Sequence, residues 1–157
     1  MRVSFLFIWL IFFSFIFSAC SQPEDKVIRE LIFQMKKEAE ALDFDAFMEH
    51  ISKHYKDDSG NTYLIIYQLI KNNTKELDAL SAEVSVLGVS VRDKKAEAQI
   101  KLMVQARKRG EIYYLLGKED LPEFPRLFFA KEGFSWKLVK VSGIKGESQA
   151  GGWWQDF

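Results

Sequence analysis

The histidines and acids of residues 50–58 are the first side chains in this sequence whose types and spacing could support chemistry. His50 and His54 stand four residues apart, so a helix would present both on one face, as a pair of metal ligands requires. Asp57 and Asp58 follow closely, but no third ligand stands at a telling spacing. Such a pair more often represents two exposed histidines near a helix end. The sequence therefore predicts no metal site, no other cofactor and no identified catalytic residue.

The only cysteine, Cys20, is the second chemically distinctive residue. Before it, residues 3–19 are apolar except for three serines, and Arg2 supplies one positive charge at the start. A short apolar run with a cationic start and small residues at its end is typical of an export signal. As a helix the run would be about 25 Å long, slightly short of the roughly 30 Å core of a bilayer. An uncleaved membrane anchor is the alternative.

Residues 17–20, Phe-Ser-Ala-Cys, resemble the lipobox of bacterial lipoproteins, where leucine is usual at the first position. The resemblance implies that residues 1–19 are a lipoprotein signal peptide and that Cys20 carries acyl chains. Residues 20–22 would then be the lipidated N-terminus and a short tether to the membrane. Ser21 stands where lipoproteins kept at the inner membrane usually carry aspartate. The resemblance thus favours the periplasmic face of the outer membrane over the inner membrane.

Charge and cysteine content limit the classes of partner. The chain has 22 Lys and Arg against 22 Asp and Glu, and only Arg2 lies in the leader. A nucleic-acid-binding domain normally carries a basic excess on one face, so no nucleic acid is expected as a partner. With its one thiol committed to lipid, the exported domain has no disulfide. Residues 20–157 suffice for one domain with a substantial core, which packing must stabilise.

The apolar periodicity predicts three helices in the first half of the exported chain. A capping-box pattern in residues 21–24 opens a long helix. Its apolar stripe recurs at steps of three and four over residues 27–42. A shorter helix is expected over residues 43–51, and a third over residues 62–73 after a polar loop.

After the third helix the apolar period changes from 3.6 to 2, which predicts strands. The strand over residues 80–91 changes phase beside Gly88, as a β-bulge would require. The strand over residues 96–106 alternates most regularly. Further strands are expected over residues 112–116, 127–130 and 135–141. Three helices followed by a bent antiparallel sheet is an α+β pattern.

These elements resemble, in order and local pattern, the nuclear transport factor 2-like superfamily, a cystatin-like cone fold. The superfamily includes ketosteroid isomerase, scytalone dehydratase and the polyketide cyclases. The resemblance is carried by the long first helix, residues 43–47, the loop over residues 54–60, the third helix and the bulged hairpin. It implies that residues 23–143 form three helices packed on a strongly bent antiparallel sheet, with a cavity at the open end. A hydrophobic signal helix would precede this domain, and residues 144–157 would be a flexible aromatic tail.

The residues predicted to point into the cone argue against catalysis. Enzymes of the superfamily hold a carboxylate or histidine base and tyrosine or acid donors inside an apolar cone. The inward set of the most regular strand contains no acid, base or hydroxyl; it is Ala98, Ile100, Leu102 and Val104. The sequence therefore favours a non-catalytic, lipid-anchored periplasmic module that binds a small apolar ligand or a protein partner.

Two other functions remain open. Tyr55, Asp58 and Tyr63 fall where the mouth of the cone is expected and are the candidate polar groups of a cavity. An isomerase, cyclase or dehydratase would use residues near Tyr55 and Asp58. The alternative for the tyrosines is packing in the core with hydroxyls at the rim. The third function is a structural envelope protein that forms a homodimer through its sheet.

Two exposed features could contact other molecules. Residues 107–109, Arg-Lys-Arg, form a basic hairpin tip that could touch anionic lipid, although such runs are usually solvated. Trp153, Trp154 and Phe157 lie after two glycines near the end of the sequence. Aromatic side chains in a tail fold back over an apolar cavity, reach a partner or lie in a membrane interface. We favour folding back.

Overall fold

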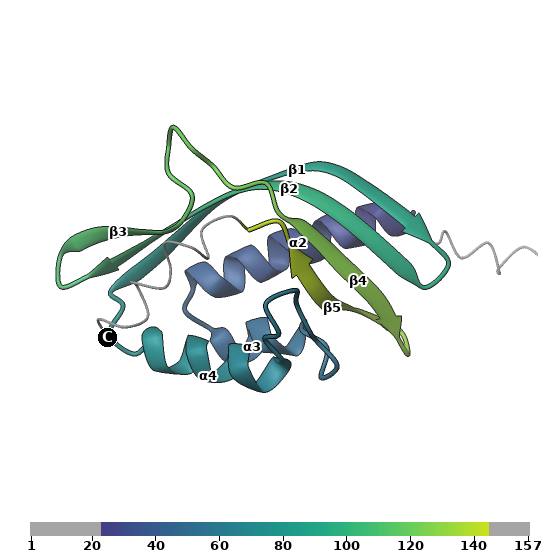
Figure 1. The fold of residues 1–157 in the computed structure, drawn as a ribbon, viewed down its shortest axis with the longest axis horizontal. Helices are drawn as coiled ribbons and strands as arrows, with labels where there is room; N and C mark the ends of the chain where they lie inside the picture. The colour runs from purple at the N-terminus through teal and green to yellow at the C-terminus, as the bar shows by residue number, and fades with distance from the viewer. Residues whose placement is uncertain (1–22, 145–157) are drawn as a thin grey trace, which may run out of the picture.

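The computed structural model describes residues 23–144 (Figure 1). The helices are α2 (Glu24–Glu40), α3 (Phe44–Glu49) and α4 (Tyr63–Asn73). The strands are β1 (Ala79–Arg92), β2 (Lys95–Lys108), β3 (Glu111–Leu116), β4 (Arg126–Glu132) and β5 (Ser135–Ser142). The predicted α+β architecture of three helices on a bent antiparallel sheet is confirmed.

Some of the predictions fall outside the described residues. These are the signal peptide 1–19, the lipidated Cys20 with its tether 20–22, and residues 145–157 of the aromatic tail. All of them stay predictions. Within residues 23–144, no helix has both the length and the apolar character that a membrane span requires.

Helix α2 is the central helix of the domain. Pro23 occupies its cap position and accepts the N–H of Lys26 at 2.9 Å, with no side-chain cap. Its apolar stripe buries Ile28, Ile32 and Met35 against the sheet. The helix ends at Glu40, two residues before the end of the stripe, because the next turn closes around a residue with a positive φ.

The sheet is built around the long β1–β2 hairpin. Its register runs from the pair Ala79 and Arg107 to the pair Arg92 and Lys95, and it shifts between Val86 and Gly88. The predicted β-bulge is therefore confirmed. The strand order is β1-β2-β4-β5, and β3 pairs with the half of β2 that β4 leaves unpaired.

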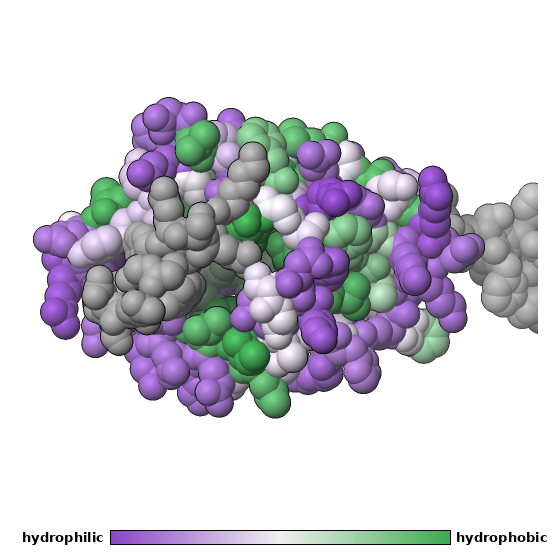
Figure 2. Space-filling view, in the orientation of Figure 1, coloured by the Kyte–Doolittle hydropathy of each residue, from purple (hydrophilic) through white to green (hydrophobic). Residues whose placement is uncertain are grey.

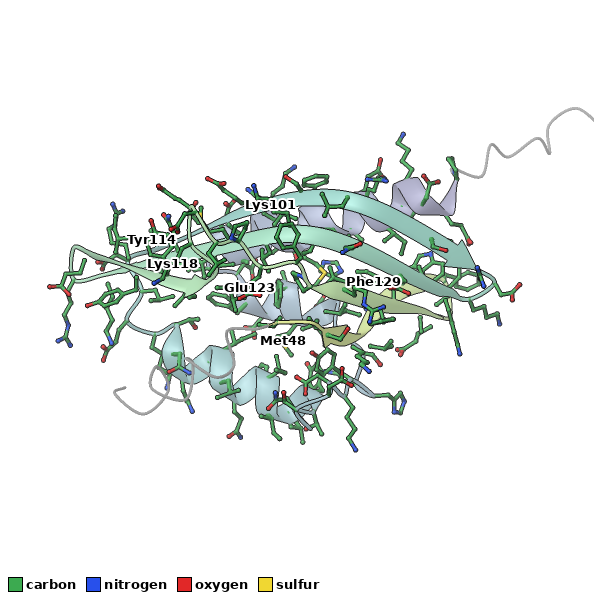
Figure 3. All side chains as sticks on the ribbon, turned by 45° about the horizontal axis from the view of Figure 1, so that its top comes forward. Met48, Lys101, Tyr114, Lys118, Glu123 and Phe129 are labelled. Carbon is green, nitrogen blue, oxygen red and sulfur yellow. The ribbon has the colours of Figure 1, made fainter. Side chains whose placement is uncertain are left out.

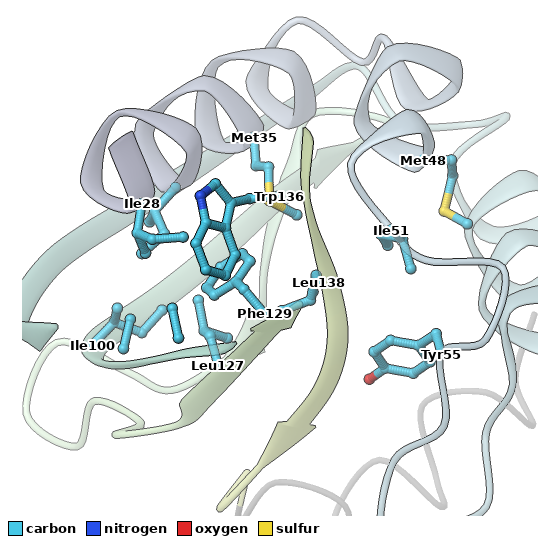
Figure 4. Close-up of a cluster of buried hydrophobic side chains, with 13 residues drawn as sticks. Ile28, Met35, Met48, Ile51, Tyr55, Ile100, Leu127, Phe129, Trp136 and Leu138 are labelled. Atoms are coloured by element: carbon cyan, nitrogen blue, oxygen red, sulfur yellow. The ribbon is translucent and has the colours of Figure 1, made fainter. Parts of the chain in front are cut away.

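The sheet arches over α2, while α3 and α4 lie on the other side of that helix from β1 and β2 (Figure 1). The core fills the space between the sheet and α2 and continues to α3 and the segment after it (Figure 4). Ala98 of β2 is fully buried in this core and pairs with Leu127 of β4. The core residues are Ile28, Ile32, Met35, Met48, Ile51, Tyr55, Ala96, Ala98, Ile100, Leu127, Phe129, Trp136 and Leu138.

The segment between α3 and α4 fastens the helical layer to β5. Leu138 donates its N–H to the carbonyl of His50 at 2.8 Å, and Ser52 donates to the carbonyl of Leu138 at 2.9 Å. Further along, Lys56 donates to the carbonyl of Val139 at 3.1 Å. These bonds bring the loop that precedes α4 against the last strand.

Candidate functional site

An open groove of about 410 Å³ lies between α3 and α4, and we call it the α3–α4 groove. Its apolar wall comes from the α2–α3 turn, from α3 and from α4. The apolar lining residues are Leu42, Phe44, Met48, Tyr67 and Ile70. Exposed charges stand at its edges: Asp43 and Asp45 at the start of α3, and Lys71 and Lys75 at the end of α4.

The groove exists because α4 is only partly covered. Tyr63, Ile66, Tyr67 and Ile70 follow the helical period and pack against the core, yet no residue of α4 is buried. On the other side of the helix Leu64 is 69% exposed. Figure 2 shows a hydrophobic patch at the lower edge of the molecule, where Figure 1 places α4. Apolar surface of this kind typically marks a binding site.

Leu42 reaches the groove through a strained backbone. It has φ 57°, a conformation that costs a residue other than glycine roughly 1–2 kcal/mol. Leu42 donates its N–H to the carbonyl of Ala39 at 3.0 Å, and Asp43 donates to that of Glu38 at 2.9 Å. This pattern ends helices and usually places glycine at the strained position. Leu42 is therefore a non-glycine residue in this position at the wall of the groove, where its contribution to binding can be tested by substitution.

The two ends of the groove differ in how their side chains are held. Asp43 is the N-cap of α3, and its Oδ1 accepts the N–H of Ala46 at 3.1 Å. At the end of α4 the Lys71 ammonium lies 5.6 Å from the centre of the Tyr67 ring. The Tyr63 ring stacks on that of Tyr67, with centroids 6.4 Å apart, and Lys53 lies 3.6 Å above Tyr63. Each of the two stacked tyrosine rings thus has a lysine ammonium near it: Lys53 at Tyr63 and Lys71 at Tyr67.

The predicted cavity-mouth residues do not line the α3–α4 groove. Tyr55 is buried in the core beside Ile51 and Leu138 (Figure 4). The Asp58 side chain is 66% exposed, and its Oδ1 lies 2.6 Å from the ammonium of Lys140 on β5. Tyr63 is half-buried at the first turn of α4. Whether these residues face a ligand stays a prediction.

The helical acids and His50 join elements to one another. His50 Nε2 lies 2.9 Å from Oε2 and 3.1 Å from Oε1 of Glu38, which ties the end of α3 to α2. Glu40 Oε1 accepts the N–H of Ala82, and its Oε2 lies 2.7 Å from Lys36 Nζ. Burial opposes ionisation of Glu40, but the Ala82 N–H and the Lys36 ammonium outweigh it and lower the pKa of the carboxyl. These groups act as structural ties.

The histidine pair is divided by the end of α3. His50 is the C-cap of that helix, whereas the exposed His54 lies beyond it and donates its N–H to Ser52 Oγ at 3.0 Å. Among residues 23–144, no group of three or more His, Cys, Asp or Glu side chains could hold a metal ion.

The basic hairpin tip contacts an acid. Lys108 Nζ lies 2.8 Å from Glu76 Oε2, and Arg109 lies 3.5 Å from the same oxygen. The hydrogen bond and charge of Lys108, followed by the charge of Arg109, lower the pKa of Glu76. Part of the positive charge of this tip is therefore already balanced.

Other polar side chains lie on elements that do not form the α3–α4 groove. Lys101, Tyr114, Lys118 and Glu123 lie on β2, β3 and the β3–β4 connection (Figure 3), and none of them lines the α3–α4 groove. A second groove, of about 790 Å³, lies at the β1–β2 hairpin. Its lining is mostly polar and charged: Ser90, Arg92, Asp93, Lys94, Lys95, Ala96, Glu97 and Phe128. By residue type the α3–α4 groove is the more apolar of the two, since half of its lining residues are apolar.

Sequence reasoning identified the apolar face of α4 but missed Leu42, Phe44 and Met48 as parts of a site. The available signal was an acid–apolar alternation at residues 43–45, which places Phe44 between two exposed acids. That pattern predicts a helix start and gives no indication of a groove.

Comparison of the fold with solved structures supports the cone architecture. A nuclear transport factor 2-like protein with a cystatin-like fold from Novosphingobium aromaticivorans matches with a TM-score of 0.60 and 22% identity. The match covers 85% of this chain and 90% of that one. A protein from the same organism, named a candidate scytalone dehydratase, matches with a TM-score of 0.61 and 11% identity, over 75% of this chain and 80% of that one.

A longer protein shares the fold as well. Bd1075 of Bdellovibrio bacteriovorus matches with a TM-score of 0.61 and 9% identity over 74% of this chain, which spans only 40% of the length of Bd1075. No protein-family model and no curated protein matches the sequence. The matches to solved structures show that residues 23–144 have the cystatin-like cone fold of nuclear transport factor 2-like proteins.

Proposed function

We propose that this chain is a lipid-anchored module of the bacterial envelope that binds a small apolar ligand in the α3–α4 groove and does not catalyse a reaction. The observation that carries the proposal is α4. Its sequence from Tyr63 to Ile70 is apolar except for Gln68, yet none of its residues is buried. Beside it lies a groove within the roughly 300–1,000 Å³ typical of ligand sites.

The acids of this region favour binding over acid–base chemistry. The carboxylates that line the groove, Asp43 and Asp45, are exposed at its edge, and the less exposed acids outside it are held by other groups. Glu38 and His50 contact each other, and Glu40 is held by Lys36 and the backbone of Ala82. Catalysis would require a base within hydrogen-bond reach of the substrate. The apolar groove wall offers a ligand contact area, while the charges at its edges stay in water.

The binding test compares two positions on α4. Ile70→Gln removes an apolar side chain from the groove, whereas Leu64→Gln makes a similar change on the exposed side of the helix. Glutamine is a good helix former, so both variants retain helix propensity. Burying an isoleucine side chain is worth roughly 1.5–3 kcal/mol. We expect Ile70→Gln to weaken binding of the neutral fluorophore N-phenyl-1-naphthylamine by about tenfold.

Leu64→Gln is expected to leave the affinity unchanged, and the melting temperatures of both variants report folding. Equal affinity in all three proteins would contradict a ligand site in the groove. Native mass spectrometry of the wild type would in addition reveal a ligand that is carried through purification.

The proposed location at the periplasmic face of the outer membrane depends on Cys20. Each buried methylene of an acyl chain contributes about 0.8 kcal/mol, so two or three chains give a stable tether. Labelled palmitate should enter the wild type and should not enter Cys20→Ala. Incorporation into Cys20→Ala would exclude this attachment site.

The enzyme alternative is supported by the relative named a candidate scytalone dehydratase. It would require Tyr55 or Asp58 to reach a substrate. Asp58 instead contacts Lys140, and Tyr55 packs in the core. Turnover of a cyclase or dehydratase substrate that is lost in both Tyr55→Phe and Asp58→Asn would favour the enzyme.

The homodimer remains a proposal as well. The outward side of the β1–β2 hairpin is largely polar; it includes Ser81, Glu83, Ser85, Glu97, Gln99, Lys101 and Gln105. Cores of stable interfaces are depleted in charge, so we expect any dimer through this face to be weak. Light scattering over a range of protein concentrations measures the molar mass and so shows how strongly the protein dimerises.

A further inference from the structure

The α3–α4 groove has a candidate occupant in the same chain. Residues 145–157 follow the described domain and carry three large aromatic side chains: Trp153, Trp154 and Phe157. Each such side chain can bury about 150–250 Å². We propose that Trp153 and Trp154 dock in the α3–α4 groove of their own chain, and that an apolar ligand binds by displacing them.

The end of the described chain lies on the appropriate side of the molecule. Lys140 on β5 contacts Asp58 at 2.6 Å, in the loop that leads directly into α4. Ile144 is four residues further along. Extended chain spans roughly 3.3–3.6 Å per residue, so residues 145–157 can reach up to about 45 Å. Helix α4 has 11 residues and is therefore only about 16 Å long.

The charges at the edge of the groove also suit residues 145–157 as its occupant. Lys71 and Lys75 lie at the edge of the groove, and among residues 23–144 neither forms an ion pair with a carboxylate. Asp156 stands two residues after Trp154. With the indole rings against Tyr67 and Ile70, this carboxylate lies within reach of the lysines. Residues 151–152 are both glycine, which allows the backbone to turn before the aromatic pair.

Because residues 145–157 are joined to the domain, even a weak contact with the α3–α4 groove suffices for docking. A segment joined by a short flexible linker is present at a millimolar effective concentration. Such a segment occupies a groove even where the free peptide would bind poorly. The part of the proposal that concerns ligand displacement rests on the proposed function, whereas docking of the segment does not.

Docking is measured by tryptophan quenching in residues 20–157 with Cys20→Ser. This fragment contains every core residue and lacks Trp9, and its buried Trp136 is a constant reference. The emission of Trp153 and Trp154 is obtained by comparison with Trp153→Phe/Trp154→Phe. We expect acrylamide to quench the pair weakly in the parent protein and in Leu64→Gln, and at least twofold more strongly in Ile70→Gln. Strong quenching in the parent, or no change in Ile70→Gln, overturns docking.

Displacement is measured by titration with N-phenyl-1-naphthylamine. Trp153→Ser/Trp154→Ser should bind the fluorophore about fivefold more tightly than the parent, because it lacks the tethered competitor. Gln149→Ser, a change in the same segment that leaves its aromatic side chains in place, is the control and should bind like the parent. Weak quenching combined with unchanged affinity overturns displacement. If neither the parent nor Trp153→Ser/Trp154→Ser binds, the proposed function fails, and the quenching result still decides docking.

Discussion

Glu40 Oε1 accepts the N–H of Ala82 at 3.0 Å and so joins the last turn of α2 to the first strand of the sheet. The other oxygen of this carboxylate contacts the Lys36 ammonium. The bond holds the helix against β1 close to the turn that carries Leu42. It therefore links the position of the groove wall to the sheet.

Glu40→Ala is expected to destabilise the domain by about 1–2 kcal/mol, since the Ala82 N–H loses a charged acceptor. The pKa of Glu40 is lowered on folding from 4.5, so its ionised form stabilises the fold. This contribution is complete above pH 4.5 and is lost as the pH falls through the lower pKa of the folded state. Urea unfolding at about pH 7 and about pH 3 should show a difference between wild type and variant that shrinks at the lower pH.

The pairing of His50 with Glu38 predicts a second stability effect. His50→Leu leaves the Glu38 carboxylate, whose side chain is 13% exposed, with a weaker set of partners. We expect a loss of about 1–2 kcal/mol. His54→Leu is the matched control, because His54 is exposed and should change stability by less than about 0.5 kcal/mol. Equal losses in the two variants would show that the Glu38 contact is not the cause.

Leu42→Gly separates stability from binding. Glycine removes the cost of a positive φ, about 1 kcal/mol, which offsets the loss of a half-buried leucine side chain. We expect the melting temperature to change little while fluorophore affinity falls. The control Ala41→Gly, at an ordinary helical φ of −76°, should lose about 0.5–1 kcal/mol of stability and retain binding. A Leu42→Gly protein that binds normally would indicate that Leu42 does not contribute to the site.

Gly117, at the start of the β3–β4 connection, is a position that requires glycine. Gly117 has φ 63°, and an added Cβ would lie 3.0 Å from the carbonyl oxygen of Leu102 and from the amide of Glu123. Those two residues exchange backbone hydrogen bonds at 2.9 and 3.0 Å. Gly117→Ala should therefore cost more than about 2 kcal/mol. Gly133→Ala has a similar φ, 61°, with no atom within 4 Å, and should cost only about 1 kcal/mol. Thermal unfolding compares the two.

Local patterns in the sequence predicted most of the fold. The spacing of Ile28, Ile32 and Met35 indicated the buried face of α2, since helical period depends on neighbouring residues alone. The change of phase beside Gly88 predicted the bulge in β1. The expected helix over residues 43–51 is shorter in the structure, because α3 ends at Glu49 and the chain then pairs with β5. Pairing with a distant strand has no local signature.

The sequence by itself determined the element order, the apolar faces and the α+β class, because each follows from periodicity within a short window. Only the tertiary structure decided where the groove lies. It requires the turn at Leu42 to meet an α4 that rests incompletely on the core, and these residues are far apart in sequence. The same holds for Asp58, whose position beside Lys140 depends on β5 lying against the loop before α4. Contacts between distant segments depend on how whole layers pack, and no local pattern encodes them.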